Sequence, residues 1–438
     1  MPPPPIKYNP AFLTPDELIQ SFVVRYDDLE AILRQLRENA DAPNNQHMLI
    51  LGPRGSGKTT LVMRAAVEIA RQPTLAAHWH PLVFAEESYE VSTPGEFWLE
   101  AIFHLKEKSG DPRWSQTYDE LARETQDERL RERALGQLLS HADSLQRRIL
   151  LIVENLNMLL GDQLSNDDAW ILRHTLQNEK RLMLLATATS RFEQIEQADK
   201  AMFELFRVHQ LHPLSQDDCR TVWTLRSGQD PGAGRTRAIE ILTGGNPRLL
   251  TIIGTFGKDV SFHDLMQDLV RLVDDHTEYF KSHLDSLAAT ERKVYLALAE
   301  IWDPATAREV AEAARMEVSA TSALLRRLIE RGAVVEADGS GERKKCYQVA
   351  ERMYNIYYLM RRRGAPSRRV HAVVNFVVQF YAPDEVVSTA RRIAEEACGL
   401  QPGKRQDHYQ AYQAILERLP DPNIRKRIVD ASPRSFFE

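Results

Sequence analysis

Short apolar runs alternate with helical patterns along the first half of the chain. Continuous apolar stretches at 47–51, 148–153, 181–190 and 206–211 predict strands. A strand that is covered on both faces of a parallel sheet shows such a run instead of strict alternation. Between the first two of them, residues 60–70 repeat their apolar positions at helical spacing. The pattern predicts an α/β domain with a parallel β-sheet.

Residues 86–147 place a long helical stretch between two of these strand blocks. Residues 92–105 begin with helix-capping residues and have an amphipathic helical pattern, whereas 119–145 are charge-rich with sparse leucines. Because no heptad pattern persists, we expect a helical insertion (about 110–147) packed on the sheet, not a coiled coil.

Beyond Pro213 the pattern becomes helical, starting with a Ser215 cap followed by acidic residues. Three helical patterns at 288–299, 306–314 and 318–332 then precede residues 334–349, which alternate around a glycine turn. This order is typical of a winged helix-turn-helix with a two-stranded wing. The last residues, 364–438, predict three or four helices.

The segment between the first strand and the first helix carries the strongest chemical signal. It reads Gly52-Pro-Arg-Gly-Ser-Gly-Lys-Thr59, the G-x-x-x-x-G-K-[ST] phosphate-binding pattern in its strand–loop–helix context. Glycines allow backbone N–H groups to surround phosphates, Lys58 reaches the β- and γ-phosphates, and Thr59 ligates Mg²⁺. ATP and Mg²⁺ are therefore the predicted cofactors. The predicted nucleotide-binding loop comprises Gly52, Pro53, Arg54, Gly55, Ser56, Gly57, Lys58, Thr59 and Thr60.

The strand at 148–153 ends in Glu154-Asn155, where most P-loop proteins of this type have Asp-Glu. In one interpretation, Glu154 holds the metal and Asn155 occupies the place of the base, although an amide cannot accept a proton at neutral pH. In the other, shifted by one residue, Val153 occupies the metal position and Glu154 is the base. Either alternative lacks one carboxylate, which favours slow hydrolysis.

Hydroxyl groups end the strand at 181–190. Thr187 or Thr189 could sense the γ-phosphate or the attacking water, with a simple strand cap as the alternative. Thr189 is the candidate for a catalytic role.

In the helical region after Pro213, the segment Leu242-Thr-Gly-Gly-Asn-Pro-Arg-Leu-Leu250 resembles a turn found in the AAA+ superfamily. The resemblance is more narrowly to STAND and archaeal-type ATPases and to origin-recognition-complex-like initiators. The resemblance implies that Pro247 and Arg248 open a lid helix and direct an arginine at the γ-phosphate. It also implies that Arg25, in Phe22-Val-Val-Arg-Tyr-Asp-Asp-Leu29, lies beside the adenine.

In that superfamily a neighbouring subunit usually supplies a further arginine. By location, Arg173, Arg191 and Arg207 are the candidates for this role.

Local charge favours nucleic acid as a partner of the winged helix. Residues 315–370 carry 13 Lys and Arg against 6 Asp and Glu, within a chain of net charge −6. Phosphate contacts are expected on the third helix and the wing, and Ser319, Thr321 and Ser322 are expected to face base edges. The predicted DNA-binding residues are Arg326, Arg327, Arg343, Lys344 and Lys345. The alternative is that this module binds protein.

Composition adds only general limits. The 438 residues are 43% hydrophobic and 27% charged, and no apolar run approaches the roughly 18 residues that span a bilayer. The N-terminus has no secretory pattern, and three scattered cysteines fit a reducing compartment, so we expect a cytoplasmic protein without membrane contact.

These patterns together predict a slow AAA+/STAND-like ATPase that couples nucleotide state to self-association and to binding of double-stranded DNA. The alternative is a largely non-hydrolysing scaffold whose winged helix and C-terminal helices bind protein partners. The expected divisions are an N-terminal arm (1–20), a P-loop ATPase core (21–212), a helical lid (213–285), a winged helix (286–363) and an all-α C-terminal region (364–438).

Overall fold

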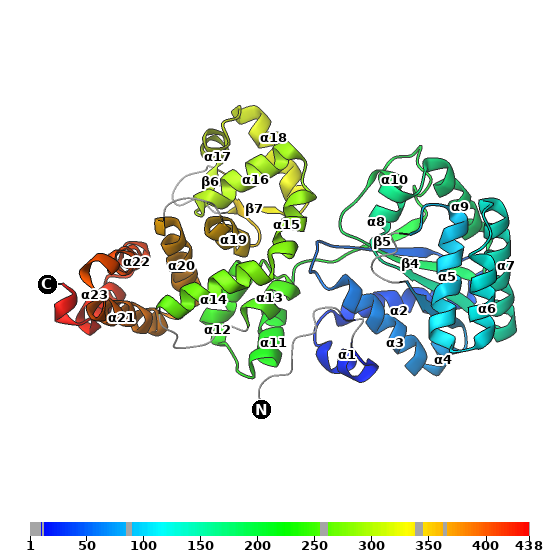
Figure 1. Cartoon of the computed structure of the whole chain (residues 1–438), viewed down its shortest axis with the longest axis horizontal. Coiled ribbons are helices and arrows are strands. Elements are labelled where there is room, and N and C mark those ends of the chain that lie inside the picture. Colours follow the sequence, from blue (N-terminus) through cyan, green and yellow to red (C-terminus); the bar gives the residue numbers. More distant parts are fainter. Residues whose placement is uncertain are drawn as a thin grey trace. The chain divides into compact units, whose positions relative to one another are not determined.

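The computed structural model describes residues 10, 13–84, 90–254, 262–337, 345–361 and 366–437. The chain divides between His212 and Pro213 into two units, each with its own core (Figure 1). Within the described residues, no helix has the length and apolar character needed to cross a bilayer.

Unit 1 is built on five parallel strands in the order β2-β3-β4-β1-β5. The strands are β1 (His47–Leu51), β2 (Trp79–Val83), β3 (Arg148–Val153), β4 (Leu182–Ala188) and β5 (Phe206–Gln210). The helices are α1 (Pro15–Ser21), α2 (Tyr26–Asp41), α3 (Lys58–Arg71), α4 (Pro73–Ala76), α5 (Pro94–Ser109), α6 (Pro112–Leu121), α7 (Asp127–Leu145), α8 (Leu156–Met158), η2 (Leu159–Gln163, a π-helix), α9 (Asn166–Asn178) and α10 (Glu193–Glu196). The predicted parallel α/β fold is confirmed.

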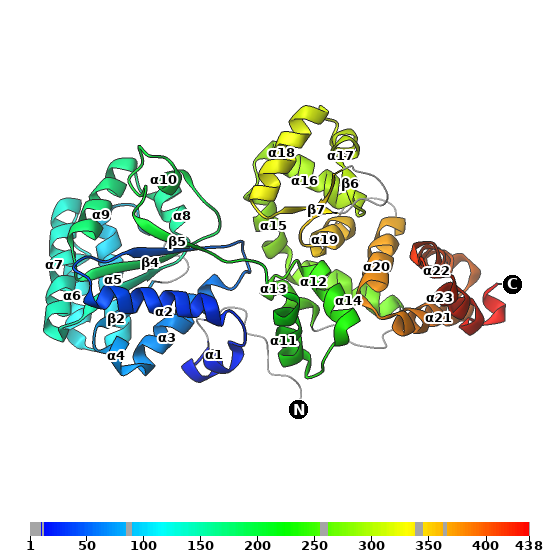
Figure 2. The same cartoon turned by 180° about the vertical axis from the view of Figure 1, so that it is seen from behind.

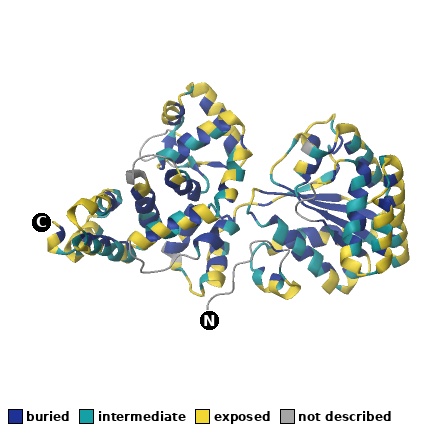
Figure 3. Ribbon diagram, in the orientation of Figure 1, coloured by how far each residue is buried: buried dark blue, intermediate teal, exposed yellow. Residues whose placement is uncertain are grey.

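Side chains alternate between the two faces of this sheet. Met48 and Ile50 of β1 belong to one core cluster, which α2 and α3 cover. Leu49 and Leu51 belong to a second cluster on the opposite face, which α5, α7 and α9 cover. Both faces are therefore buried, which explains why the strands are apolar at successive positions (Figure 3).

The long helical stretch between β2 and β3 packs against the second cluster. Thr93 caps α5 by accepting a hydrogen bond from the Glu96 N–H, and Asp111 caps α6 in the same way from Arg113. Trp98 of α5 and Leu138 of α7 are fully buried. The charged residues of α7 remain on its outer side, so the segment covers the sheet as a layer of helices.

Unit 2 begins with helices and ends with helices (Figure 2). Its first five helices are α11 (Gln216–Ser227), α12 (Gly232–Thr243), α13 (Pro247–Ile253), α14 (Phe262–Asp275) and α15 (Thr277–Asp285). Ser215 and Asp218 form a reciprocal capping box at the start of α11, as its sequence predicts.

A winged helix follows the first five helices of unit 2. Its elements are α16 (Ala289–Ile301), β6 (Ala305–Thr306), α17 (Ala307–Ala314), α18 (Val318–Glu330), β7 (Val334–Ala337) and β8 (Cys346–Val349). The wing is an antiparallel sheet in the order β6-β8-β7. The third strand, β6, is absent from the sequence prediction because two residues are too short to produce a pattern.

Helices complete unit 2, namely α19 (Met353–Arg361), α20 (Pro366–Phe380), α21 (Pro383–Gly399), η3 (Pro402–Lys404), α22 (Gln406–Arg418), α23 (Pro422–Ala431) and η4 (Arg434–Phe436). Arg235 of α12 forms an ion pair with Glu385 of α21, and its guanidinium lies 5.3 Å from the ring centroid of Phe380. These contacts attach the C-terminal helices to the first helices of the unit.

Candidate functional site

The loop after β1 has the backbone shape of a phosphate-binding site. Gly55 and Gly57 adopt φ values of +82° and +92°, a region that side chains disfavour, and α3 begins at the next residue. A Cβ atom on Gly52 would lie 2.7 Å from Ser56 Oγ and 3.2 Å from Leu211 Cβ, so the loop has no room for a side chain there. The glycines therefore set the curve of the loop.

Lys58 stands at the start of α3 and is 8% exposed. Its Nζ donates hydrogen bonds to the carbonyl oxygens of Gly52, at 2.7 Å, and Pro53, at 3.1 Å. Ser56 Oγ is buried and has no hydrogen-bond partner among the described residues. A buried ammonium group held by weak neutral acceptors and an unsatisfied hydroxyl fit the phosphates of a nucleotide.

The Thr59 hydroxyl donates a hydrogen bond to Oε2 of Glu154, which directly follows β3. The contact joins the two residues that the sequence predicts as Mg²⁺ ligands, and Glu154 is only 9% exposed. No group of three or more His, Cys, Asp or Glu that could hold a metal ion occurs in the described part of the chain. One hydroxyl and one carboxylate fit Mg²⁺, which takes few protein ligands and completes its shell with water and phosphate oxygens.

Two hydrogen bonds connect the end of β3 with β4. The N–H of Asn155, a residue in the left-handed conformation, donates to Thr187 Oγ1 at 3.2 Å, and the N–H of Thr189 donates to Asn157 Oδ1 at 3.2 Å. Thr187 is fully buried and thus supports the turn after Glu154. Thr189 is half-buried and stays the candidate for a sensing role. Asn157 has no motif that could have identified it.

Arg25 lies between α2 and the last residue of unit 1. Its side chain is 7% exposed and donates to Asp28 Oδ2 at 3.1 Å and to the carbonyl of His212 at 3.0 Å. His209 Nε2 lies 2.7 Å from Oδ1 of the same Asp28. Burial alone would raise the pKa of the Asp28 carboxyl, but hydrogen bonds with His209 and Arg25 outweigh it and lower that pKa. The predicted adenine contact of Arg25 stays a prediction.

In unit 2, the turn before α13 is organised by Asn246. Its Oδ1 accepts hydrogen bonds from the N–H groups of Arg248, at 3.0 Å, and Leu249, at 3.4 Å. Pro247 occupies the first helical position, where a missing N–H costs nothing. The Arg248 guanidinium lies 4.8 Å from the ring centroid of Tyr279, a cation–π contact. The expected action of Pro247 and Arg248 on a nucleotide stays a prediction.

The outer face of α18 carries Arg326 and Arg327, and both are exposed. Arg326 also pairs with Glu330 at 3.3 Å, and Lys345 with Glu336 at 3.0 Å. Arg343 and Lys344 lie outside the described residues.

The expectation that Thr321 faces a base edge is wrong. Thr321 is fully buried, and its hydroxyl donates to the carbonyl of Glu317 at 3.0 Å. It faces inward because it belongs to the buried side of α18, together with Leu324, Leu325 and Leu328. Ser319 and Ser322 are on the exposed side.

Comparison with known proteins finds a family model that matches most of unit 1. Residues 21–187 match the family model of the AAA ATPase domain. The chain contains an AAA ATPase domain. In unit 2, residues 286–367 match the family model of the sugar-specific transcriptional regulator TrmB. No match was found among curated protein sequences.

Solved structures that match this chain include archaeal proteins. A Walker-type ATPase of Pyrococcus abyssi is 15% identical, with 77% of this chain and 99% of that chain covered and a TM-score of 0.49. The ORC2 protein of Aeropyrum pernix with ADPNP and ADP is 13% identical, with 81% and 94% covered and a TM-score of 0.46. The ORC1 protein of Aeropyrum pernix in complex with DNA is 13% identical, with 81% and 93% covered and a TM-score of 0.40.

The three arginines predicted to act on a neighbouring subunit differ in their contacts. Arg173 of the AAA ATPase domain donates to the carbonyl oxygens of Ala201 and Phe203. Arg207 donates to Gln35 Oε1 at 2.8 Å. Arg191 is exposed, and the described residues offer its guanidinium no partner. Of the three, Arg191 is the one whose side chain is not already used within its own unit.

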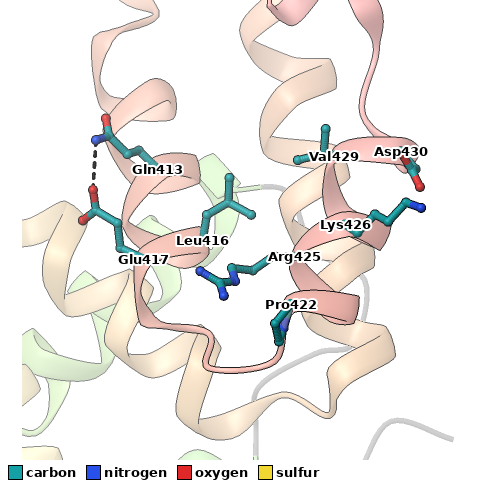
Figure 4. A pocket seen from close by; sticks show the side chains of 8 residues that line it. All are labelled: Gln413, Leu416, Glu417, Pro422, Arg425, Lys426, Val429 and Asp430. Carbon is teal, nitrogen blue, oxygen red and sulfur yellow. Dashed lines mark hydrogen bonds between the residues drawn. The ribbon is translucent and has the colours of Figure 1, made fainter.

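At the other end of the chain, a groove of about 620 Å³ lies between α22 and α23. Figure 4 shows Leu416 and Val429 on its two sides, with Arg425 and Lys426 on the α23 side. Val429 is 43% exposed. The groove combines an apolar lining with charged residues of both signs, Arg425 and Lys426 together with Glu417 and Asp430.

Proposed function

We propose that this chain is an ATP-dependent switch that hydrolyses slowly and controls DNA binding through its winged helix. The observation that carries the proposal is the hydrogen bond between Thr59 and Glu154 at the start of the Lys58 helix. It brings a hydroxyl and a carboxylate to the end of a phosphate-binding loop, the place where an AAA ATPase domain holds Mg²⁺.

The same hydrogen bond favours the interpretation that Glu154 serves the metal and Asn155 occupies the base position. Mg²⁺ would neutralise phosphate charge, while Lys58 and the loop N–H groups orient the phosphates. The Asn155 amide can position a water molecule but cannot take its proton. Without that proton acceptor we expect long-lived ATP binding and slow turnover.

Arg248 is the proposed reporter of nucleotide state. A guanidinium that binds the γ-phosphate loses that contact after hydrolysis, so it can distinguish ATP from ADP. Thr189, at the end of β4, is the proposed sensor within unit 1. Arg25 is the proposed contact with the adenine.

Two observations support DNA as the partner of the winged helix. The family model matched by residues 286–367 describes transcriptional regulators, and α18 presents Arg326 and Arg327 to solvent. Arg191, exposed at the end of β4, supports self-association in which one subunit completes the site of another.

One experiment tests these steps together. The full-length protein is sized by light scattering with ADP, with ATP and with a slowly hydrolysed ATP analogue, each with and without duplex DNA. We expect larger assemblies and DNA association with ATP or the analogue, and their absence with ADP. An assembly state and a DNA affinity that are identical in all nucleotides would contradict the switch.

The alternative is a nucleotide-binding scaffold with a protein partner, and the groove between α22 and α23 favours it. Its lining fits an amphipathic helix whose apolar side covers Leu416 and Val429 and whose charged residues of both signs pair with Arg425, Lys426, Glu417 and Asp430. The sizing experiment is repeated with Leu416→Asp and Val429→Asp. DNA association that persists in these variants would favour the switch over the scaffold.

A further inference from the structure

A largely buried polar network joins the Asn246 turn to the base of the wing. Asn246 Nδ2 donates to Oε1 of Glu351 at 2.8 Å and also lies 2.9 Å from the hydroxyl of Tyr279. Glu351 follows β8 by two residues, whereas Tyr279 belongs to α15. One amide therefore connects three segments that are distant in sequence.

Tyr279 lies at the centre of this network. Its hydroxyl hydrogen-bonds with the Glu351 carboxylate and with the hydroxyl of Tyr354. The face of its ring carries the Arg248 guanidinium at 4.8 Å. The same side chain thus contacts the arginine that would report nucleotide state and the carboxylate at the base of the wing.

Close backbone packing keeps these segments together. Gly244 has a φ of +59°, and a Cβ atom there would lie 2.7 Å from the carbonyl oxygen of Ala350, the residue before Glu351. Such an approach allows no side chain and little sliding, so a displacement of the turn must move the end of β8 or break the contact.

The groups around the Glu351 carboxyl are mostly neutral. Tyr279 of α15 and Asn246 of the turn hydrogen-bond to it, and Tyr295 of α16 and Tyr354 of α19 are near enough to interact with it electrostatically. Arg248 is the cation that acts on Tyr279. Burial raises the pKa of the Glu351 carboxyl to about 7, although hydrogen bonds from Asn246 and Tyr279 act in the opposite direction.

We propose that Tyr279 and Glu351 couple the nucleotide state read by Arg248 to the position of the winged helix. The inference rests on the proposed function, because it takes Arg248 as the arginine that binds the γ-phosphate. A guanidinium that turns to a phosphate leaves the ring of Tyr279. The network then loses its neighbouring positive charge, and the contact between the turn and the end of β8 weakens.

The test compares DNA affinity in a slowly hydrolysed ATP analogue with DNA affinity in ADP. The ratio of the two dissociation constants measures the coupling directly, and couplings of this kind are commonly about fivefold or larger. In Glu351→Gln and Tyr279→Phe we expect this ratio to approach one. The affinity for ATP measured without DNA should stay within about twofold, because neither residue touches the nucleotide in the proposal.

Two matched variants control for local damage. Glu278→Gln removes an exposed carboxylate next to Tyr279, and Tyr357→Phe removes a hydroxyl in the same aromatic cluster, where Tyr357 stacks on Phe280 at 4.7 Å. Both should keep the wild-type ratio. Thermal unfolding of all four variants shows whether they fold.

Hydrogen exchange of α18 and β8 in the ATP analogue and in ADP provides a readout that does not need DNA. If the wild-type protein shows a nucleotide-dependent difference there and the two network variants lose it, the inference holds even when DNA is not the partner. If the network variants keep the wild-type ratio and the wild-type exchange difference, the inference is overturned while the proposed function stands. If nucleotide changes neither readout in the wild-type protein, both are overturned.

Discussion

Glu154 in unit 1 and Glu351 in unit 2 have the same local arrangement with different surroundings. Each carboxylate follows a strand, β3 or β8, and accepts a hydrogen bond from a hydroxyl group on a helix, Thr59 or Tyr279. The helix that reaches Glu154 begins at Lys58, whose ammonium group is held by two carbonyls. Around Glu351 stand three tyrosines.

The difference shows how the neighbourhood determines what a carboxylate can do. Next to a phosphate-binding loop, a hydroxyl and a carboxylate form half of a site for a hard cation. Among tyrosine rings, the Glu351 carboxylate has no cationic partner in the part of the chain that the structure describes, and its pKa rises to about 7. The first arrangement suits binding of a ligand, and the second suits a contact that can be altered.

The largest effect is expected from removing the ammonium group of Lys58, which directly precedes Thr59, the hydrogen-bond partner of Glu154. Lys58→Ala should weaken ATP binding by about a thousandfold, since charge-assisted hydrogen bonds to phosphate contribute roughly 1.5–3 kcal/mol each. Titration calorimetry measures the affinity, with Lys180→Ala, an exposed lysine on the same unit, as the control. A normal affinity for ATP in Lys58→Ala would show that this loop is not the nucleotide-binding site and that Glu154 does not lie beside bound phosphates.

The next largest effect is expected in how the stability of the folded state depends on pH through Glu351. A raised pKa means that the folded state binds the proton more tightly, so the stabilising contribution is present below about pH 4.5 and is lost as pH rises to about 7. Glu351→Gln should lack this loss of about 3 kcal/mol.

Denaturant unfolding of wild-type protein and Glu351→Gln at pH 5 and pH 8 checks this, because the difference between the two proteins cancels other titrating groups. Glu278→Gln serves as the exposed control. If the free energy of unfolding depends on pH in the same way in wild type and Glu351→Gln, the pKa of Glu351 is not raised by its surroundings.

A smaller effect should follow from supplying the missing base beside Glu154. Asn155→Glu should raise ATP turnover by about tenfold, at the low end of what a positioned general base contributes. Phosphate release under saturating ATP measures it, and Asn157→Asp, two residues along, is a control that adds charge without the predicted position. No rise in Asn155→Glu would favour the alternative frame, with Val153 at the metal position and Glu154 as base.

The smallest effect is expected on DNA binding by the exposed face of α18, which belongs to the winged helix that the Glu351 network would move. Replacing both Arg326 and Arg327 by alanine should weaken DNA binding by about fivefold and reduce the salt slope by about 0.9 for each phosphate that the variant no longer neutralises. Arg391→Ala is a matched control, since Arg391 also pairs with a glutamate four residues later, at 3.5 Å. An unchanged salt slope would assign the winged helix to a protein partner.

The sites around Glu154 and Glu351 also differ in how far the sequence could predict them. The phosphate loop is contiguous, and the strands before and after it have strong apolar patterns, so the fold of unit 1 and the meeting of Thr59 with Glu154 could be anticipated. The hydrogen bond between the Asn155 N–H and Thr187 could not, because it requires the register of β3 and β4.

The network around Glu351 leaves almost no trace in the sequence. Asn246, Tyr279 and Glu351 are separated by 33 and 72 residues and share no motif. A glutamate after a strand looks like an exposed residue unless the partner that covers it is known. The expectation for Thr321 fails for a related reason: a short hydroxyl side chain fits either face of a helix, and only the packing of α18 decides between them.

The close approach of Gly244 to Ala350 limits how this protein can be dissected. A fragment ending near residue 285 would lose Glu351 as the acceptor for Asn246 and would leave Tyr279, 3% exposed in the whole protein, open to solvent. A fragment starting near residue 286 would carry the Glu351 carboxyl without either hydrogen-bond donor. The first five helices and the winged helix of unit 2 are therefore best expressed, crystallised and mutated as one piece.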